Sequence, residues 1–207
     1  MKRLILALAP LAMTLACGGG SSSPTPAGPS PVPTASTPPP AASWRGTMTA
    51  VRRTLVSPLD TTQSFEGTVT FEPGDILNTY DPPDLLAPLI PTNALTYVLQ
   101  PGLLKLTHTG SVGPCSYGTG SWDVLMKKSD GYLFVAPNGS VGGRVTLPDT
   151  AFPVTVTCPT GTAQSETGVQ MDLFISGSVI GTRISGTMTP LTVAGTTFSG
   201  SWNFEAR

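Results

Sequence analysis

The sequence contains little charge and few of the side chains on which metal and redox chemistry depend. Charged residues make up 11% of the 207 positions, there are three cysteines, and His108 is the only histidine. Transition metals in proteins are bound mainly by His and Cys side chains, which are too few here to complete a site. Motifs of serine hydrolases, zinc peptidases, phosphate-binding loops and Cys-x-x-Cys redox proteins are also missing. We therefore expect no catalytic residue, no transition metal and no cofactor.

The charge that is present argues against a nucleic-acid partner. The formal net charge is −1, and loss of the N-terminal Lys2 and Arg3 would leave 9 basic against 12 acidic residues. Proteins that bind nucleic acids or anionic surfaces carry a basic patch, which this composition does not supply. We expect no nucleic acid among the partners.

The first 16 residues are organised like an export signal. Lys2 and Arg3 precede an apolar run from Leu4 to Ala16, which is too short to span a bilayer comfortably but typical of a signal peptide. Cleavage after Ala16 makes Cys17 the new N-terminus. This pattern resembles the lipobox of bacterial lipoproteins, although Thr14 stands where that family most often has Leu. The alternative is an ordinary secretory signal followed by an incidental cysteine.

The lipobox resemblance implies an address for the mature chain. Cys17 would carry a diacylglycerol and an N-acyl chain, and two or more chains anchor a protein stably without crossing the membrane. The glycine that follows Cys17, in place of aspartate, is similar to the outer-membrane sorting pattern of diderm bacteria. We expect a lipid-anchored protein of the cell envelope.

The two other cysteines, Cys115 and Cys158, are predicted to form a disulfide. An odd number of cysteines in an exported protein needs an explanation, and acylation of Cys17 leaves an even pair. Two thiols in an oxidising compartment form a disulfide readily. Two reduced core cysteines, or half of a metal site, are the alternatives.

Residues 17–43 have the composition of a tether. From Gly18 to Ser43 the sequence has no charged residue and consists almost entirely of Pro, Ser, Ala, Gly and Thr, which bury too little apolar surface to fold. In polyproline II, at about 3.1 Å per residue, this segment can hold a domain up to roughly 80 Å from the membrane. Residues 44–207 are then long enough for a single folded domain.

Period-two alternation in residues 44–207 predicts an all-β domain. In Phe65–Phe71 and Phe198–Phe204 the apolar or glycine positions share one face and the polar positions the other. Pro137-Asn138-Gly139 predicts a type I′ hairpin turn between two strands. No segment of this domain has a convincing helical pattern. Further strands are expected around Met48, Trp122, Val145, Val156, Leu173 and Ile184.

Glycines recur on the apolar faces of these strands, two positions from a bulky residue. Examples are Gly46 beside Met48 and Gly200 beside Trp202. Inward glycines allow a sheet to coil sharply, which favours an antiparallel β-barrel of about 8–10 strands over the alternative β-sandwich. The first and last strands share the motif, as strands that meet to close a barrel would. The Gly-x-Trp element distantly resembles the calycin barrels, lipocalins and avidins, which implies no ligand residue here.

Two groups of polar residues in strands are interpreted as surface features. His108 in Lys105–Thr109 is expected on the strand surface in preference to a general-base role. The pairs Arg52-Arg53 and Lys127-Lys128 are expected at solvated edges or turns.

The segment from Pro73 to Asn93 departs from the strand pattern, and long irregular segments within a domain are often functional. Oxygen-bearing side chains recur at every third position, which makes a weak calcium candidate of Asp75, Asn78, Asp81 and Asp84. Next comes Leu85–Ile90, an uncharged run. It either plugs one end of the barrel or presents Leu85, Leu86, Leu89 and Ile90 as an apolar lip to a ligand, protein or membrane.

Three function classes follow from these observations. The first is a non-catalytic envelope lipoprotein whose β-barrel binds a partner, such as an envelope protein. The second is a lipocalin-like carrier of a small apolar ligand, since inward glycines can leave a cavity. The third is a glycan hydrolase that uses two carboxylates, although no spacing in the sequence nominates the pair.

Overall fold

The protein is represented by a computed structural model that describes residues 40–79, 89–190 and 194–207. Strands make up most of the described domain. In chain order the elements are β1 (Trp44–Val56), β2 (Leu59–Pro73), α1 (Ile76–Thr79), β3 (Leu95–Leu99), β4 (Gly102–Val112), β5 (Cys115–Met126), η3 (Lys128–Asp130), β6 (Gly131–Val135), β7 (Ser140–Cys158), β8 (Gly161–Ile180), β9 (Arg183–Pro190) and β10 (Thr196–Ala206).

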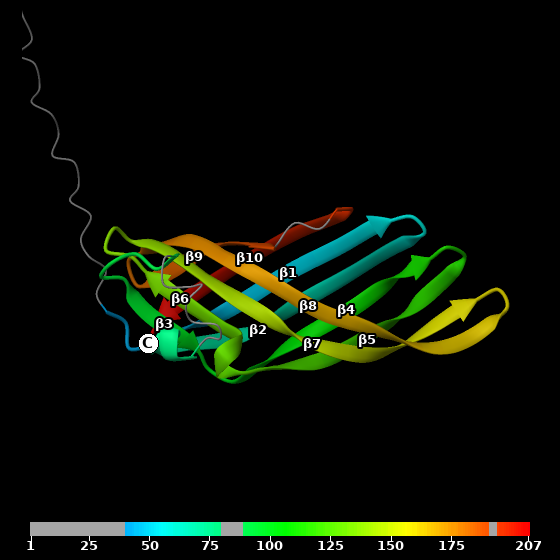
Figure 1. Cartoon of the computed structure of the whole chain (residues 1–207), viewed down its shortest axis with the longest axis horizontal. Helices are drawn as coiled ribbons and strands as arrows, with labels where there is room; N and C mark the ends of the chain where they lie inside the picture. The colour runs from blue at the N-terminus through cyan, green and yellow to red at the C-terminus, as the bar shows by residue number, and fades with distance from the viewer. Residues whose placement is uncertain (1–39, 80–88, 191–193) are drawn as a thin grey trace, which may run out of the picture. The chain divides into compact units, whose positions relative to one another are not determined.

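The strands close into an antiparallel barrel of eight strand positions (Figure 1). Neighbours in the ring are β1, β2, β4, β5, β7, β8, β9 and β10, and β10 returns to pair with β1. The closing ladder runs from Trp44 opposite Ala206 to Thr54 opposite Thr196. The predicted barrel, and the predicted meeting of its first and last strands, are therefore confirmed.

The two remaining strands, β3 and β6, each share a position in the ring with another strand: β3 shares that of β4, and β6 shares that of β5. β2 pairs with β4 over Leu59–Glu66 and with β3 over Phe71–Pro73, so β3 and β4 follow one another along the same neighbour. Pro101 lies between them, and proline cannot donate a hydrogen bond to a ladder. In the same way β5 and β6 follow one another along β7, and on their other side β5 pairs with β4 and β6 pairs with β3.

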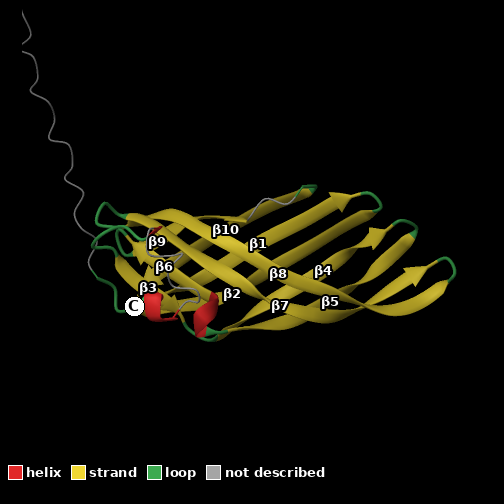
Figure 2. Ribbon diagram, in the orientation of Figure 1, coloured by secondary structure: helices red, strands yellow, loops and turns green. Residues whose placement is uncertain are grey.

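The barrel has two different ends. The turns after β1, β4 and β7 lie at one end of the barrel, which we call the hairpin end. The first strand, β1, begins at the other end, where the last strand, β10, finishes (Figure 1). Figure 2 shows the short helical segments α1 and η3 away from the hairpin end. The two ends therefore present different residues.

The hydrophobic core lies inside the barrel and follows the predicted alternation. In β2, Phe65, Val69 and Phe71 point inward while Glu66 and Thr68 are exposed. In β10, Trp202 and Phe204 are buried and Asn203 between them is exposed. The fully buried large side chains include Tyr97, Phe71, Phe204, Leu99, Leu104, Leu106, Met126, Leu133, Leu147 and Leu173.

Glycine is required where neighbouring strands approach most closely. A Cβ atom at Gly46 would lie 1.9 Å from the carbonyl oxygen of Asn203, across the ladder that closes the barrel. A Cβ atom at Gly186 would lie 1.9 Å from the carbonyl oxygen of Ser176. Only a residue without a side chain fits these two positions.

The predicted disulfide is present. Cys115 and Cys158 have an S–S distance of 2.05 Å and are 43 residues apart in sequence. They stand at the start of β5 and the end of β7, so the bond joins the β4–β5 and β7–β8 hairpins at the hairpin end. The pairs Ser116–Thr157 and Tyr117–Val156 lie directly beside it.

Two local predictions need correction. A short helix, α1, occupies Ile76–Thr79, where no helix was expected. It is only one turn long, which is too short for a helical hydrophobic period to show in sequence. The hairpin at Asn138-Gly139 is present, but only Gly139 has a positive φ, of 81°. The type I′ prediction is therefore wrong, because that turn requires positive φ at both central residues.

The outer wall explains the low charge of the sequence. Short polar side chains form rows across β2, β1, β10 and β9, since the register aligns Thr68, Thr47, Asn203 and Ser185. In the next row Thr49 Oγ1 lies 3.2 Å from Ser201 Oγ. Threonine and serine thus supply the polar surface that charged residues supply in most proteins.

Candidate functional site

A layer of polar side chains crosses the barrel interior near the hairpin end. Its members, which we call the polar layer, are Arg52, Gln63, His108, Tyr117 and Thr167. The strand register places Arg52 of β1 opposite Gln63 of β2, and Gln63 opposite His108 of β4. Three neighbouring strands of the barrel, β1, β2 and β4, thus contribute one polar residue each at the same level.

Hydrogen bonds and a ring contact connect the polar layer. Arg52 Nη2 donates to Gln63 Oε1, and Gln63 Nε2 donates to Thr167 Oγ1 of β8 at 3.5 Å. The His108 ring packs edge-on against Tyr117 of β5, with the ring centroids 5.2 Å apart. Side chains of five strands therefore converge on this level.

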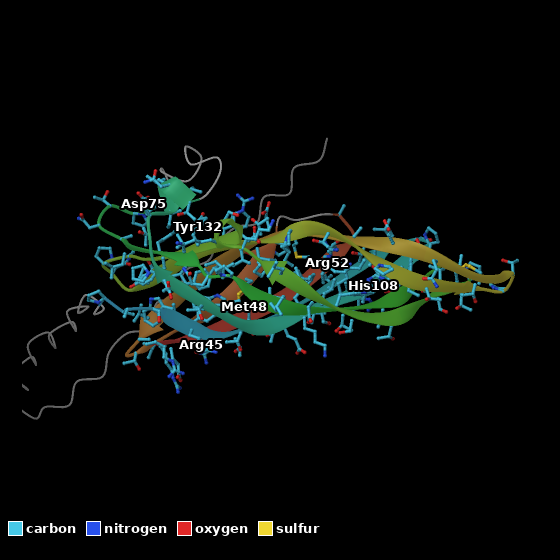
Figure 3. The ribbon with its side chains drawn as sticks, turned by 90° about the horizontal axis from the view of Figure 1, so that it is seen from below. Arg45, Met48, Arg52, Asp75, His108 and Tyr132 are labelled. Atoms are coloured by element: carbon cyan, nitrogen blue, oxygen red, sulfur yellow. A yellow bond between two sulfur atoms is a disulfide. The ribbon has the colours of Figure 1, made fainter. Side chains whose placement is uncertain are left out.

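His108 is the most unusual member of the layer. Its side chain is only 2% exposed, and neither ring nitrogen has a hydrogen-bond partner among the described residues. Buried polar groups are almost always hydrogen-bonded, because leaving one unpaired costs about 1–3 kcal/mol. Figure 3 shows His108 and Arg52 in the same part of the barrel, far from Asp75 and Tyr132.

Burial and charge perturb both ionisable groups. Burial lowers the pKa of His108 below its usual value, and the positive charge of Arg52 lowers it further. Burial also lowers the pKa of Arg52, although a guanidinium stays charged at physiological pH. The polar layer therefore holds a neutral imidazole beside a fixed positive charge.

On β1 and β2 the polar layer lies between apolar residues on one side and threonines on the other. Toward the barrel centre, the inward residues preceding Arg52 on β1 and following Gln63 on β2 are Ala50 and Phe65, both buried. Toward the hairpin end, the corresponding residues are Thr54 and Thr61, which oppose each other. Arg52 itself is half-buried, so solvent reaches the layer on its side.

The expectation that His108 and both arginines of the Arg52-Arg53 pair lie on the surface is wrong in part. Arg53, Lys127 and Lys128 are exposed, as predicted. Consecutive strand residues point to opposite faces, so one arginine of an adjacent pair within a strand must point inward. His108 shares the inward face of β4 with Leu104 and Leu106, and the same alternation indicates this from sequence.

The apolar core itself is almost solid. The interior void lined by Met48, Phe65, Leu147 and Met188, among others, has a volume of about 10 Å³. A space of this size holds at most a water molecule. The inward glycines make room for large side chains, such as the Trp122 ring over Gly120.

The candidate calcium ligands are only partly described. Asp75 Oδ1 accepts a hydrogen bond of 2.9 Å from the Leu77 amide, and its Oδ2 accepts one from the Asn78 side chain. Asp75 therefore caps the start of α1. Asp81 and Asp84 lie outside the described residues, so the calcium site stays a prediction. Within the described ranges, no three His, Cys, Asp or Glu side chains gather as a metal site.

The candidate apolar lip is also only partly described. Leu89 is 58% exposed, whereas Ile90 packs against the small cluster of Ile76, Val98 and Tyr132. Leu85 and Leu86 lie outside the described part of the chain, so neither the plug nor the lip is decided. Cys17 also lies outside it, and its acylation stays a prediction.

Comparisons of the chain with protein families, with curated proteins and with solved structures give no match. Among the residues described, no helix is both long and apolar enough to cross a membrane.

Proposed function

We propose that this protein is a lipid-anchored bacterial envelope lipoprotein whose β-barrel is a non-catalytic binding domain. The observation that carries the proposal is the order of segments in the sequence: a basic start, an apolar run, a small residue before Cys17, and an uncharged Pro-rich stretch before the first strand. This order supports acylation of Cys17 and a tether that holds the barrel away from the membrane. The disulfide supports an oxidising compartment.

The barrel supports a binding role. The polar layer offers a cation and an imidazole but contains no carboxylate, serine or thiolate beside them in the described structure. Burial and the charge of Arg52 lower the pKa of His108, which disfavours the protonated imidazole that a general acid would need. A preorganised polar group near the end of a solid barrel suits recognition of a partner or ligand.

Metabolic labelling tests the anchor. Cells that express the wild-type chain are grown with radiolabelled palmitate, and we expect label in the protein and sedimentation with membranes. Cys17→Ser should abolish both, whereas Cys115→Ser and Cys158→Ser should remain labelled because those cysteines are not acylated. Label retained by Cys17→Ser would refute the anchor, and turnover of an envelope substrate by the purified chain would refute the non-catalytic role.

A further inference from the structure

The polar layer carries a positive charge that no described side chain balances. Arg53, Arg144 and Arg183 each form an ion pair, with Asp60, Asp172 and Glu205 respectively. Arg52 is the inward-facing arginine of β1, and its hydrogen-bond partner is the neutral amide oxygen of Gln63. A partly desolvated cation without an anion is costly, and proteins normally pair such charges.

His108 is an independent sign of a missing partner. The imidazole is more than nine-tenths buried, and both of its nitrogens lack a hydrogen-bond partner in the described structure. The other members of the polar layer are Arg52 from β1, Gln63 from β2, Tyr117 from β5 and Thr167 from β8, and none of these is acidic. A cation without an anion and a buried donor without an acceptor therefore occupy the same level of the barrel.

We propose that Arg52 and His108 form a binding site for a small carboxylate ligand, with Arg52 as the primary contact. The inference rests on the binding role proposed above and names the ligand class. A guanidinium has five N–H donors in a planar fork, of which Gln63 occupies at least one, and the fork matches the two oxygens of a carboxylate. The His108 N–H can supply a further donor to the same anion.

The solid core limits the shape of the ligand. Because the void beyond Ala50 and Phe65 measures only about 10 Å³, no hydrocarbon tail fits between the polar layer and the barrel centre. Toward the hairpin end, the inward residues of β1, β2 and β4 are Thr54, Thr61 and Gly110, which are small. Any remaining part of a ligand whose carboxylate contacts Arg52 must therefore be directed away from the barrel centre.

Binding of an anion is coupled to the protonation of His108. A bound carboxylate cancels the field of Arg52 and offers an acceptor to the imidazole, so both effects raise the pKa of His108 from its depressed value. By linkage, the carboxylate binds more tightly as the pH falls through the range in which His108 takes up a proton. Binding of the carboxylate would thus be accompanied by proton uptake.

The single histidine makes the test direct. The full chain, purified in a non-ionic detergent and labelled at histidine, is titrated with acetate at constant ionic strength while the ring signals of His108 are followed by NMR. We expect saturable shifts in the wild type and a titration midpoint of His108 that rises with acetate. Sodium sulfate and sodium chloride at the same ionic strength should give smaller shifts.

Arg52 and Arg53 are a matched pair on the same strand, with Arg53 facing outward toward Asp60. Arg52→Gln should weaken acetate binding about tenfold or more, corresponding to about 1.4 kcal/mol, whereas Arg53→Gln should leave it unchanged. If Arg52→Gln does not fold, Arg52→Lys keeps the charge without the fork, and should bind acetate more weakly than the wild type.

The inference is overturned if the His108 signals do not respond to acetate, respond equally to chloride, or respond alike in the wild type and the Arg52 variant. Equal loss in Arg53→Gln would also overturn it, because that outcome reports general surface charge. None of these results bears on palmitate labelling of Cys17, so failure of the carboxylate site is distinguishable from failure of the lipoprotein proposal.

Discussion

The burial of His108 predicts a specific dependence of stability on pH. In the unfolded chain the pKa of His108 is close to 6.5, whereas in the folded barrel burial and the charge of Arg52 lower it. Well above pH 6.5 neither state binds the proton, and the full stability is present. As the pH falls through 6.5, His108 takes up a proton in the unfolded chain but not in the folded chain, where its pKa is lower. The free energy of unfolding therefore decreases.

The size of this decrease follows from linkage. If the folded barrel takes up no proton at all, the free energy of unfolding falls by about 1.4 kcal/mol between pH 7.5 and pH 5.5. No other side chain of the sequence has an ordinary pKa in this window, because His108 is the only histidine. The lowered pKa of Asp172 affects stability only at far more acidic pH.

Urea denaturation followed by tryptophan fluorescence at pH 7.5, 6.5 and 5.5, without added carboxylate, measures this effect. His108→Gln removes the titrating group and should give a nearly constant free energy of unfolding over the same range. Arg52→Gln should make the decrease smaller, since the repulsion by its charge is removed, and Arg53→Gln should not. A wild type equally stable at all three pH values, or an equal decrease in His108→Gln, would refute the reasoning.

Two further predictions concern the stability of the barrel. Gly46→Ala should lower the free energy of unfolding by about 3 kcal/mol, because the new methyl group meets the Asn203 carbonyl, whereas Gly168→Ala, with open space around it, should change it by less than about 1 kcal/mol. Chemical denaturation of both variants measures the difference, and equal effects would contradict the close approach. Replacing Cys115 and Cys158 together by serine should cost about 4 kcal/mol for a loop of 43 residues. A thermal midpoint unchanged from the wild type would contradict a stabilising role for the disulfide.

Alternation and glycine placement were sufficient to predict the barrel. Phe65–Phe71 and Phe198–Phe204 point their apolar residues inward as expected, and the shared glycine motif of β1 and β10 correctly indicated that these strands meet. These features are visible in sequence because side-chain period and close backbone approach are local properties. The division of one strand position into β3 and β4, on either side of Pro101, was harder to foresee. It depends on which residues of β2 pair with each of the two strands, and this pairing is not a local property of the sequence.

The polar layer was not predicted, although part of its signal is present in the sequence. His108 lies two positions from Leu106 and four from Leu104, so alternation alone places it on the inward face. It was interpreted as a surface residue because polar side chains usually lie on the surface, and the alternation along the strand was given less weight. The convergence with Gln63 and Tyr117 depends on the register between strands, which a single sequence does not specify.

The ladder between β1 and β10 has a consequence for how the chain reaches its native state. The first strand of the domain, β1, finds its second partner only in the last strand, β10. A nascent chain that lacks those final residues leaves β1 with an open edge, and no earlier segment substitutes for it. The barrel can therefore close only after residues 196–206 have been synthesised, and loss of these residues would leave the first strand without its second partner.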